Sequence, residues 1–361
     1  MNPPLIVIGA GGTAGHVVPA LAVADALRAE GAQVVFAGGE RAEKELVPAA
    51  GYELVPLRVA PLPRRSLTGA LHAVAVDGGA VRAARRLMRS LRPRAVLGAG
   101  GYVAGPVGLA AALSRVPLVL MEADSHLGLT NRLLAPLAQR VCLAFPIEGR
   151  EGERYLVTGR PGPRPAEDRD AARVRFGIGS DETCVLVFGG SLGARSINQA
   201  AIAAFAGARF HVLHAAGERD LPDLSSPGDH YDLRGFMSDF GEALLASDLV
   251  VARSGGSVFE VAAHGRPMVL IPYPHATADH QTANARFMER AGAAVVIPDA
   301  ELTASRLAQE VGHLLADPVR LAAMARASAQ LARPDAAQRI AHEALVASGR
   351  SSPNRPDTDV H

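Results

Sequence analysis

Three glycine-rich segments hold the residues whose types and spacing could do chemistry. Gly11, Gly12 and Gly15 follow an apolar run at 5–10 and lead directly to His16. Glycines let backbone N–H groups turn toward one point at the positive end of a helix, an arrangement that binds phosphate oxygens. An imidazole directly after such a loop can accept a proton near neutral pH. The plainer interpretation of His16 is a helix-terminal histidine that bonds only the backbone.

The other two segments lie in the second half of the chain. Residues 185–198 repeat the strand, loop and helix pattern, with Ser191 in the turn, where hydroxyl and amide groups can bind a diphosphate. Residues 252–260 form the third segment, which ends at Glu260. A carboxylate at that place can bind the two hydroxyls of a ribose, or it can be a solvated group stabilised by the helix dipole. The small residues of this third loop are Gly255, Gly256 and Ser257.

A nicotinamide or flavin site is one alternative for the first segment. Gly9, Gly11 and Ala14 approximate the dinucleotide fingerprint, which expects an acid at the end of the second strand. Here that strand ends in glycines, and Glu40 lies beyond them. We therefore expect no such cofactor.

A metal site is an alternative for the loop at 272–284. His275, Asp279 and His280 could resemble a ligand cluster, but no second carboxylate or cysteine lies nearby. We expect no metal there. Asp279, His280, Gln281 and Asn284 suit recognition of sugar hydroxyls instead.

The elements that must position these loops alternate as in a parallel α/β sheet. Nearly continuous aliphatic runs, typical of strands covered on both faces, occur at 5–10, 33–38, 53–59, 95–100, 117–122 and 140–145. Helices are predicted between them at 17–30, 42–50, 67–90, 105–114 and 130–137. The runs restart at 184–189, 210–215, 232–236, 249–252, 267–272 and 293–297, after a turn-rich linker at 159–165. We expect two Rossmann-like, doubly wound domains and a ligand site in the cleft that they face.

Composition agrees with this plan. The chain has 361 residues, 48% hydrophobic and only 4% aromatic, which is enough for two aliphatic cores. Its net charge of +1 predicts no nucleic-acid partner. Cys142 and Cys184 lie in apolar runs and are expected to be reduced core residues. We see no signal peptide or membrane span and expect a cytoplasmic protein.

Charge is nevertheless distributed unevenly. Between residues 54 and 121 the only acid is Asp77, and a basic field of this kind can attract an anionic surface. The arginines of this stretch are Arg58, Arg64, Arg65, Arg82, Arg85, Arg86, Arg89, Arg92, Arg94 and Arg115.

Taken together, the segments closely resemble the family 28 UDP-N-acetylglucosamine transferases that complete lipid II in bacterial cell-wall synthesis, the MurG family. The resemblance covers roughly residues 5–347. It rests on Gly11-Gly-Thr-Ala-Gly-His16, Gly100-Gly-Tyr-Val-Ala-Gly-Pro106, Gly128-Leu-Thr-Asn131, Gly189-Gly-Ser-Leu-Gly-Ala-Arg195, Arg253-Ser-Gly255 with Glu260, and Asp279-His-Gln-Thr-Ala-Asn284. It implies a GT-B fold and an inverting transfer of N-acetylglucosamine (GlcNAc) from UDP-GlcNAc to the muramyl 4-hydroxyl of lipid I, without a cofactor.

The resemblance also implies residue roles. His16 is the expected base, with Asp124 and Glu122 as alternatives. The expected acceptor contacts are Gly12, His16, Tyr102 and Asn131. The expected donor contacts are Thr13, Ala14, Gly15, Asp124, Arg160 or Arg164, Ser191 at the phosphates, Met237 at the uracil, Gly255, Gly256, Ser257, Glu260 at the ribose, and Gln281 with Asn284 at the sugar.

Domain roles follow from the same resemblance. Residues 1–160 are expected to face the acceptor and 161–335 to bind the donor, while 336–348 form a helix that packs back on the first domain. Residues 349–361 are expected to be a disordered tail. The basic stretch from Leu62 to Arg94 is expected to contact an anionic membrane, which places the enzyme at the cytoplasmic face of the cell membrane.

The sequence departs from the family pattern around the donor sugar. Met121-Glu-Ala-Asp124 stands where the family has His-Glu-Gln-Asn, so an acceptor-only carboxylate replaces an amide. Gly159-Arg-Pro-Gly-Pro-Arg164 leaves two candidates for the phosphate-binding arginine. The loop at 253–260 is one residue shorter than usual, and His280 replaces a common glutamine. The alternatives are a GT-B transferase with another sugar or acceptor, a UDP-GlcNAc 2-epimerase-like enzyme, and a regulatory protein that only binds the nucleotide sugar.

Overall fold

A computed structural model gives the structure of residues 3–59, 67–190 and 193–350, with residues 67–77 and Thr277 described by their backbone alone. The chain forms two compact units. Unit 1 contains residues up to Pro163 and from Asp335 onward, and unit 2 runs from Arg164 to Pro334. Ser191 and the tail from residue 351 lie outside the described residues, as does the start of the basic stretch.

Unit 1 contains a seven-stranded sheet in which all paired strands are parallel, in the order β3-β2-β1-β4-β5-β6-β7. The strands are β1 (Leu5–Gly9), β2 (Gln33–Gly38), β3 (Glu53–Pro56), β4 (Ala95–Gly98), β5 (Leu118–Glu122), β6 (Arg140–Leu143) and β7 (Tyr155–Val157). The strand order reverses between β1 and β4. In open α/β sheets this is the crevice where ligands bind.

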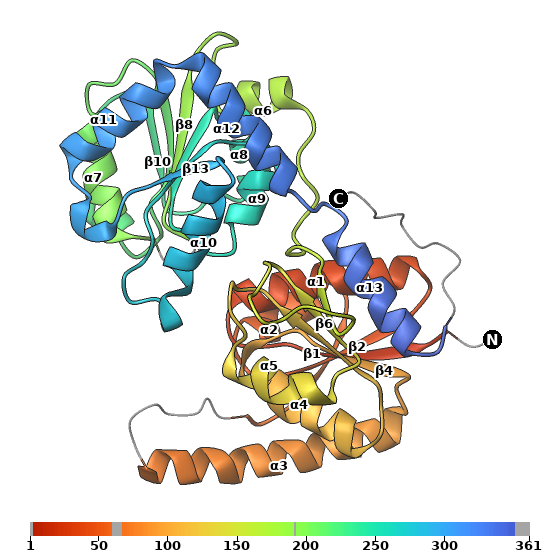
Figure 1. Cartoon of the computed structure of the whole chain (residues 1–361). Helices are drawn as coiled ribbons and strands as arrows, with labels where there is room; N and C mark the ends of the chain where they lie inside the picture. The colour runs from red at the N-terminus through yellow and green to blue at the C-terminus, as the bar shows by residue number, and fades with distance from the viewer. Residues whose placement is uncertain (1–2, 60–66, 191–192, 351–361) are drawn as a thin grey trace. The chain divides into compact units, whose positions relative to one another are not determined.

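Helices cover both faces of this sheet (Figure 1). They are α1 (Ala14–Ala29), α2 (Ala42–Ala49), α3 (Leu67–Leu91), α4 (Gly101–Leu113), α5 (Leu129–Leu134), the 3₁₀ helix η1 (Ala135–Leu137) and α13 (Ala336–Ala347). Successive β1 residues point to opposite faces: Ile6 and Ile8 pack in the layer of α1 and α13, and Val7 packs in the layer of α3 and α4. The last helix therefore belongs to the core of unit 1 although it follows unit 2 in the chain.

Unit 2 repeats the plan with a six-stranded parallel sheet in the order β10-β9-β8-β11-β12-β13. The strands are β8 (Cys184–Phe188), β9 (His211–Ala215), β10 (Tyr231–Arg234), β11 (Leu249–Ala252), β12 (Met268–Leu270) and β13 (Ala294–Val296). The helices are α6 (Arg169–Arg175), α7 (Arg195–Phe205), α8 (Phe240–Ala246), α9 (Val258–Ala263), α10 (His280–Arg290), α11 (Ala304–Leu315) and α12 (Pro318–Leu331), with η2 (Leu221–Asp223), η3 (Thr277–Asp279) and η4 (Asp299–Glu301). The order reverses between β8 and β11, so the second crevice lies beside the second glycine loop.

The predicted fold class, two doubly wound parallel α/β sheets, is confirmed, and two elements were missed. β7 is a three-residue edge strand, and α6 is a seven-residue helix in the segment after the linker. Helix α4 begins at Gly101 rather than at residue 105, so Tyr102 lies in its first turn. Cys142 and Cys184 are buried and free, as expected. Among the described residues, no helix is both long and apolar enough to cross a membrane.

Candidate active site

One group of candidate site residues lies at the carboxyl edge of the unit 1 sheet. The loop after β1 and the turn after β4 approach each other so closely that a Cβ at Gly101 would overlap the Gly11 carbonyl group. A Cβ at Gly100 would lie 2.8 Å from the His16 ring. Both Gly100 and Gly101 also have positive φ, at 90° and 74°. Glycine is required here by backbone conformation and by space together.

His16 is the third residue of α1 and is half-buried beneath this turn. Its Nδ1 lies 3.2 Å from the Thr13 hydroxyl. Burial and the Arg160 charge lower the pKa of His16, while Asp124 and Glu43 raise it by a smaller amount. The imidazole is therefore predominantly neutral at pH 7 and can accept a proton, as the sequence-based prediction requires.

Arg160 and Arg164 occupy different environments. The Arg160 guanidinium donates to the Gly15 carbonyl at 2.7 Å and to the Ala123 carbonyl at 3.2 Å. It thus joins the His16 loop to the loop after β5. Arg164 is exposed and lies at the start of unit 2. Only Arg160 is held beside the candidate base.

Glu122 is committed to the loop that follows β5. Its Oε1 accepts from the N–H groups of Ala123 (3.0 Å) and Asp124 (3.2 Å), and its Oε2 accepts from Gly128 N–H and Asn131 Nδ2, both at 2.9 Å. Burial raises the pKa of Glu122, and these hydrogen bonds oppose that effect. A carboxylate with four donors around it is a poor candidate for the base, so the structure favours His16 or the half-buried Asp124.

Asn131 lies in the same network. It is only 4% exposed, and its Nδ2 donates to the Met121 carbonyl and to Glu122, both at 2.9 Å. This amide therefore holds the loop, and direct contact between Asn131 and an acceptor stays a prediction.

Gly12 and Tyr102 meet at a buried carboxylate that the sequence did not single out. The Gly12 N–H donates to Glu43 at 2.9 Å, and the Tyr102 hydroxyl donates to Glu43 at 3.3 Å. The Gly12 N–H is therefore used within the protein in this structure, and contact between Gly12 and an acceptor stays a prediction. Thr13, Ala14 and Gly15 are exposed at the start of α1, where backbone N–H groups point away from the helix.

A second group of candidate site residues lies at the carboxyl edge of the unit 2 sheet. The donor residues predicted in unit 2 lie in the loops after β8, β10 and β11 and at the starts of α9 and α10, and parallel strands bring such segments to one edge. Gly190 and Gly193 have φ of 90° and 73°, and a Cβ at Gly193 would overlap the Ala216 carbonyl. This close approach explains the glycine at 193. Ser191, between them, is not described.

Arg253 joins these loops and was missed as a site residue. Its Nη1 donates to the carbonyls of Ile271 and Pro272, both at 3.1 Å, and to Asp299 at 2.6 Å. Its Nη2 donates to the Ser196 hydroxyl at 2.8 Å. The buried Arg253 thus fixes the start of α7 against the ends of β11 and β12. The motif Arg253-Ser-Gly255 was the available signal.

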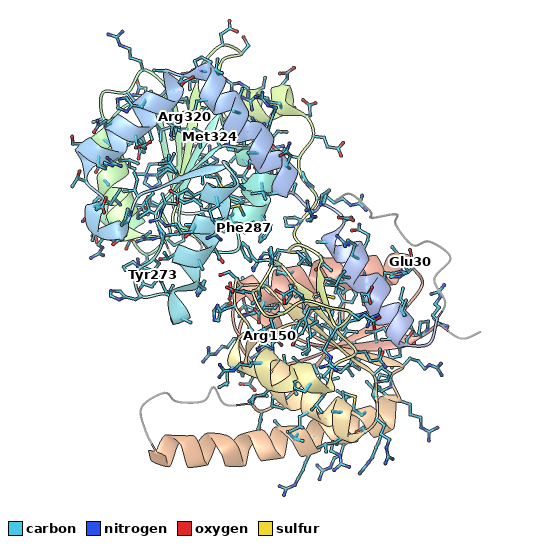
Figure 2. All side chains as sticks on the ribbon, viewed as in Figure 1. Glu30, Arg150, Tyr273, Phe287, Arg320 and Met324 are labelled. Carbon is cyan, nitrogen blue, oxygen red and sulfur yellow. The ribbon has the colours of Figure 1, made fainter. Side chains whose placement is uncertain are left out.

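The loops after β11 and β12 are held together by a chain of hydrogen bonds. Ser254 Oγ donates to the Gln281 carbonyl at 2.7 Å, and Asn284 Nδ2 donates to the Ser254 carbonyl at 3.1 Å. The Gln281 Oε1 accepts from the N–H of Tyr273 at 3.0 Å; Tyr273 is labelled in Figure 2. Asn284 has no exposed surface, so its amide supports this loop, and its contact with a sugar stays a prediction.

The remaining predicted donor residues lie around this framework. Gly255, Gly256 and Ser257 lead into α9, and Glu260 is half-buried in the first turn of that helix. The Gln281 amide lies 3.9 Å from the position of a Cβ on Gly255. These placements bring the Glu260 carboxylate, the two glycines and the Gln281 amide to neighbouring segments of unit 2.

In the loop after β10, the Met237 side chain is buried and the Phe236 side chain is exposed. The Met237 side chain is 3% exposed, which leaves its backbone as the group that could meet a base. Phe236 is 66% exposed and was not predicted as a site residue. A large exposed aromatic side chain at a strand's carboxyl end suits contact with a flat ring.

Family models match the two units of this chain separately. The model of the glycosyltransferase family 28 N-terminal domain matches residues 6–143, and that of the C-terminal domain matches residues 184–340. A UDP-N-acetylglucosamine–N-acetylmuramyl-(pentapeptide) pyrophosphoryl-undecaprenol N-acetylglucosamine transferase of Alkalilimnicola ehrlichii is 44% identical over 96% of this chain and 99% of its own. The Salinibacter ruber transferase of the same name is 42% identical over 98% and 99%.

Solved structures of related proteins have a similar fold. The crystal structure of Acinetobacter baumannii MurG has a TM-score of 0.78 at 30% identity, covering 95% of this chain and all of that one. A putative UDP-N-acetylglucosamine 2-epimerase from Listeria monocytogenes reaches a TM-score of 0.70 at 15% identity over 99% of this chain, a likeness that shows the fold alone. The chain belongs to glycosyltransferase family 28, within its group of UDP-N-acetylglucosamine–N-acetylmuramyl-(pentapeptide) pyrophosphoryl-undecaprenol N-acetylglucosamine transferases.

Proposed function

We infer that this chain is an inverting glycosyltransferase that moves GlcNAc from UDP-GlcNAc to the muramyl 4-hydroxyl of lipid I, giving lipid II for peptidoglycan synthesis. The observation that carries this inference is the match, over nearly the whole chain, to transferases named for this reaction. The neutral, half-buried His16 beside an exposed helix start supports the acceptor side of it.

In the proposed reaction, an acceptor hydroxyl beside His16 gives its proton to the imidazole as its oxygen attacks the anomeric carbon. UDP leaves from the opposite face, so the configuration at that carbon inverts. Negative charge then grows on the departing diphosphate. Amides at the start of α7 and an arginine can stabilise it, because their dipoles and charge are already oriented before the reaction.

Arg160 is our candidate for that arginine. It is already held beside Gly15 and Ala123, next to His16, and a planar guanidinium matches the geometry of phosphate oxygens. The exposed Arg164 lacks such support. In the donor half we assign Glu260 to the ribose, the Met237 backbone with the Phe236 ring to the uracil, and Gln281 to the transferred sugar.

A membrane surface is the proposed site of action, because the acceptor is lipid-linked. The exposed arginines on α3 include Arg82, Arg86 and Arg89, which share one helical face. Exposed leucines, 38–67% accessible, recur on α4 and on α5 with η1. They are Leu109, Leu113, Leu129, Leu133 and Leu137. Apolar side chains near a basic helix suit an anionic bilayer, where each arginine contributes about 1 kcal/mol.

The deciding experiment supplies radiolabelled UDP-GlcNAc with a short-chain lipid I analogue and measures labelled disaccharide-lipid. UDP-GalNAc and UDP-glucose serve as competitors, since Asp124 stands where the family has an amide. Consumption of UDP-GlcNAc to its 2-epimer without acceptor would instead identify an epimerase. Binding of UDP-GlcNAc with no turnover under any acceptor would identify a regulatory binding protein.

A further inference from the structure

Glu43 is a fully buried carboxylate at the ligand-binding edge of the unit 1 sheet. It lies in the first turn of α2, and its Oε2 accepts from the Gly12 N–H at 2.9 Å. Its Oε1 accepts from the Gly39 N–H at 2.9 Å and from the Tyr102 hydroxyl at 3.3 Å. One side chain therefore joins the segments that follow β1, β2 and β4.

The glycines around Glu43 make room for it. A Cβ at Gly11 would lie 2.6 Å from the Glu43 Oε1, and a Cβ at Gly39 would lie 2.9 Å from the same oxygen. Nucleotide-binding relatives of this fold use an acid at the end of the second strand to bind a ribose. Here the acid comes from the following helix and points inward to the protein's own amides. The Glu43 charge is stabilised by the loop's own N–H groups, because a buried carboxylate needs hydrogen-bond donors.

We propose, on the basis of the proposed function, that Glu43 is a positioning residue for acceptor use, whose carboxylate holds the His16 loop and Tyr102 in one arrangement. Gly11 and Gly12 lie in the loop between β1 and α1, the helix that carries His16. Movement of their backbone therefore moves the start of α1. Tyr102 is fixed from the other side of the crevice. Glu43 itself has no exposed surface and acts only through these groups.

Its charge gives the proposal an electrostatic readout. The groups that face His16 are Thr13 on its own loop, Arg160, Asp124 and Glu43. Burial and Arg160 lower the pKa of His16, whereas Asp124 and Glu43 raise it. Removal of the Glu43 charge should therefore move the His16 titration to lower pH.

The test compares Glu43→Gln, Glu43→Asp and the control Glu45→Gln. Glu45 lies in the same first turn of α2 but is exposed, so its variant removes an equal charge from the same helix. Two measurements need no turnover: the Gly12 and Gly39 amide signals of ¹⁵N-glycine-labelled protein, and the His16 NMR titration. Steady-state kinetics then give kcat and KM for donor and for lipid I analogue separately.

In Glu43→Gln, an amide NH₂ must face at least one buried N–H, so kcat/KM for the acceptor should fall roughly 10- to 100-fold. The donor KM should rise less than the acceptor KM, because most proposed donor contacts lie in unit 2, while Arg160 is also held by the Ala123 carbonyl. The His16 midpoint should fall and both glycine signals should move. Glu43→Asp keeps the charge but is shorter, so it should lose acceptor efficiency while the His16 midpoint stays near that of the wild type. Glu45→Gln should match the wild type throughout.

Wild-type acceptor kinetics in folded Glu43→Gln would overturn the proposal. So would a variant that only unfolds more easily while its glycine signals and His16 midpoint are unchanged. If Glu43→Gln does not fold, Glu43→Asp decides by the same signals. If the wild type makes no lipid II analogue, the proposed function fails, and the two NMR measurements still decide whether Glu43 holds the loop.

Discussion

Replacing Asn198 with alanine removes the centre of a buried polar network beneath the donor loop. Asn198 lies in the first turn of α7, and its Nδ2 donates to the Ala216 carbonyl at 2.9 Å and to Asp220 at 3.2 Å. Its Oδ1 lies 3.0 Å from Nε2 of His214, whose Nδ1 lies 2.8 Å from the Tyr231 hydroxyl. Since both amide hydrogens are already used, Nε2 of His214 must carry the proton and Nδ1 must accept from Tyr231.

The cost follows from the partners left behind. The His214 Nε2–H loses its only acceptor in this network, which costs about 1–3 kcal/mol for a buried donor. The Ala216 carbonyl and Asp220 lose a donor, but Asp220 keeps Arg219 at 2.9 and 3.1 Å, so this loss is nearer 1 kcal/mol. The free energy of unfolding should fall by about 2–4 kcal/mol in all. The KM for UDP-GlcNAc should rise roughly tenfold, because the start of α7 is no longer tied to the Ala216 backbone.

Urea unfolding checks the free energy of unfolding, and initial rates at varied UDP-GlcNAc check the donor KM. Gln199→Ala is the matched control, because it removes an exposed amide from the same helix and should cost less than about 0.5 kcal/mol. A loss below about 1 kcal/mol for Asn198→Ala would refute the reasoning. A ¹⁵N spectrum that placed the His214 proton on Nδ1 would refute it independently of stability.

Four further outcomes can be measured. His16→Ala should lower turnover at saturating acceptor by roughly 10²–10⁴-fold, and unchanged turnover would remove His16 from the role of base. Glu260→Ala should raise the donor KM with little change in kcat; an unaltered donor affinity would contradict the ribose assignment. Burial lowers the pKa of His214 to about 4 from 6.5, so the unfolded state takes up its proton first as the pH falls. The free energy of unfolding should then drop by about 3 kcal/mol between pH 6.5 and 4, and His214→Gln should lose this part of the pH dependence in urea titrations. Leu133→Asp should weaken binding to vesicles containing anionic lipid without lowering Tm, because Leu133 is 67% exposed; equal binding would exclude this face.

The sequence alone determined the architecture, because that information is local. Residues such as Ile6, Val7 and Ile8 form a short continuous aliphatic run followed by glycines, a pattern typical of a strand covered on both faces. Glycines directly after such runs predicted the loops at the carboxyl edges. Strand β7 was not predicted because it has only three residues. The start of α4 was placed too late because glycines, which are unfavourable in helices, flank Tyr102.

The candidate site was predictable only in its outline. The positions of His16 and Glu260 follow from motifs beside strand ends, and the structure puts both at the starts of helices. Whether a side-chain amide contacts a ligand or supports a loop depends on whether the fold buries it. Asn131 and Asn284 carried the same kind of signal as Gln281, but the fold buries the first two.

Only the tertiary structure decided which polar groups form hydrogen bonds with one another. Glu43 reaches Gly12 across 31 residues of sequence and Tyr102 across 59, while Arg160 reaches Gly15 across 145. No local pattern specifies such pairs, because they form only when parallel strands bring their carboxyl ends to one edge. The choice between Arg160 and Arg164, four residues apart, is of this kind: one is held by two carbonyls beside His16, and the other points to solvent. For Glu43, which has no exposed surface, burial makes the pairing specific, since a buried charge without donors is too costly to keep.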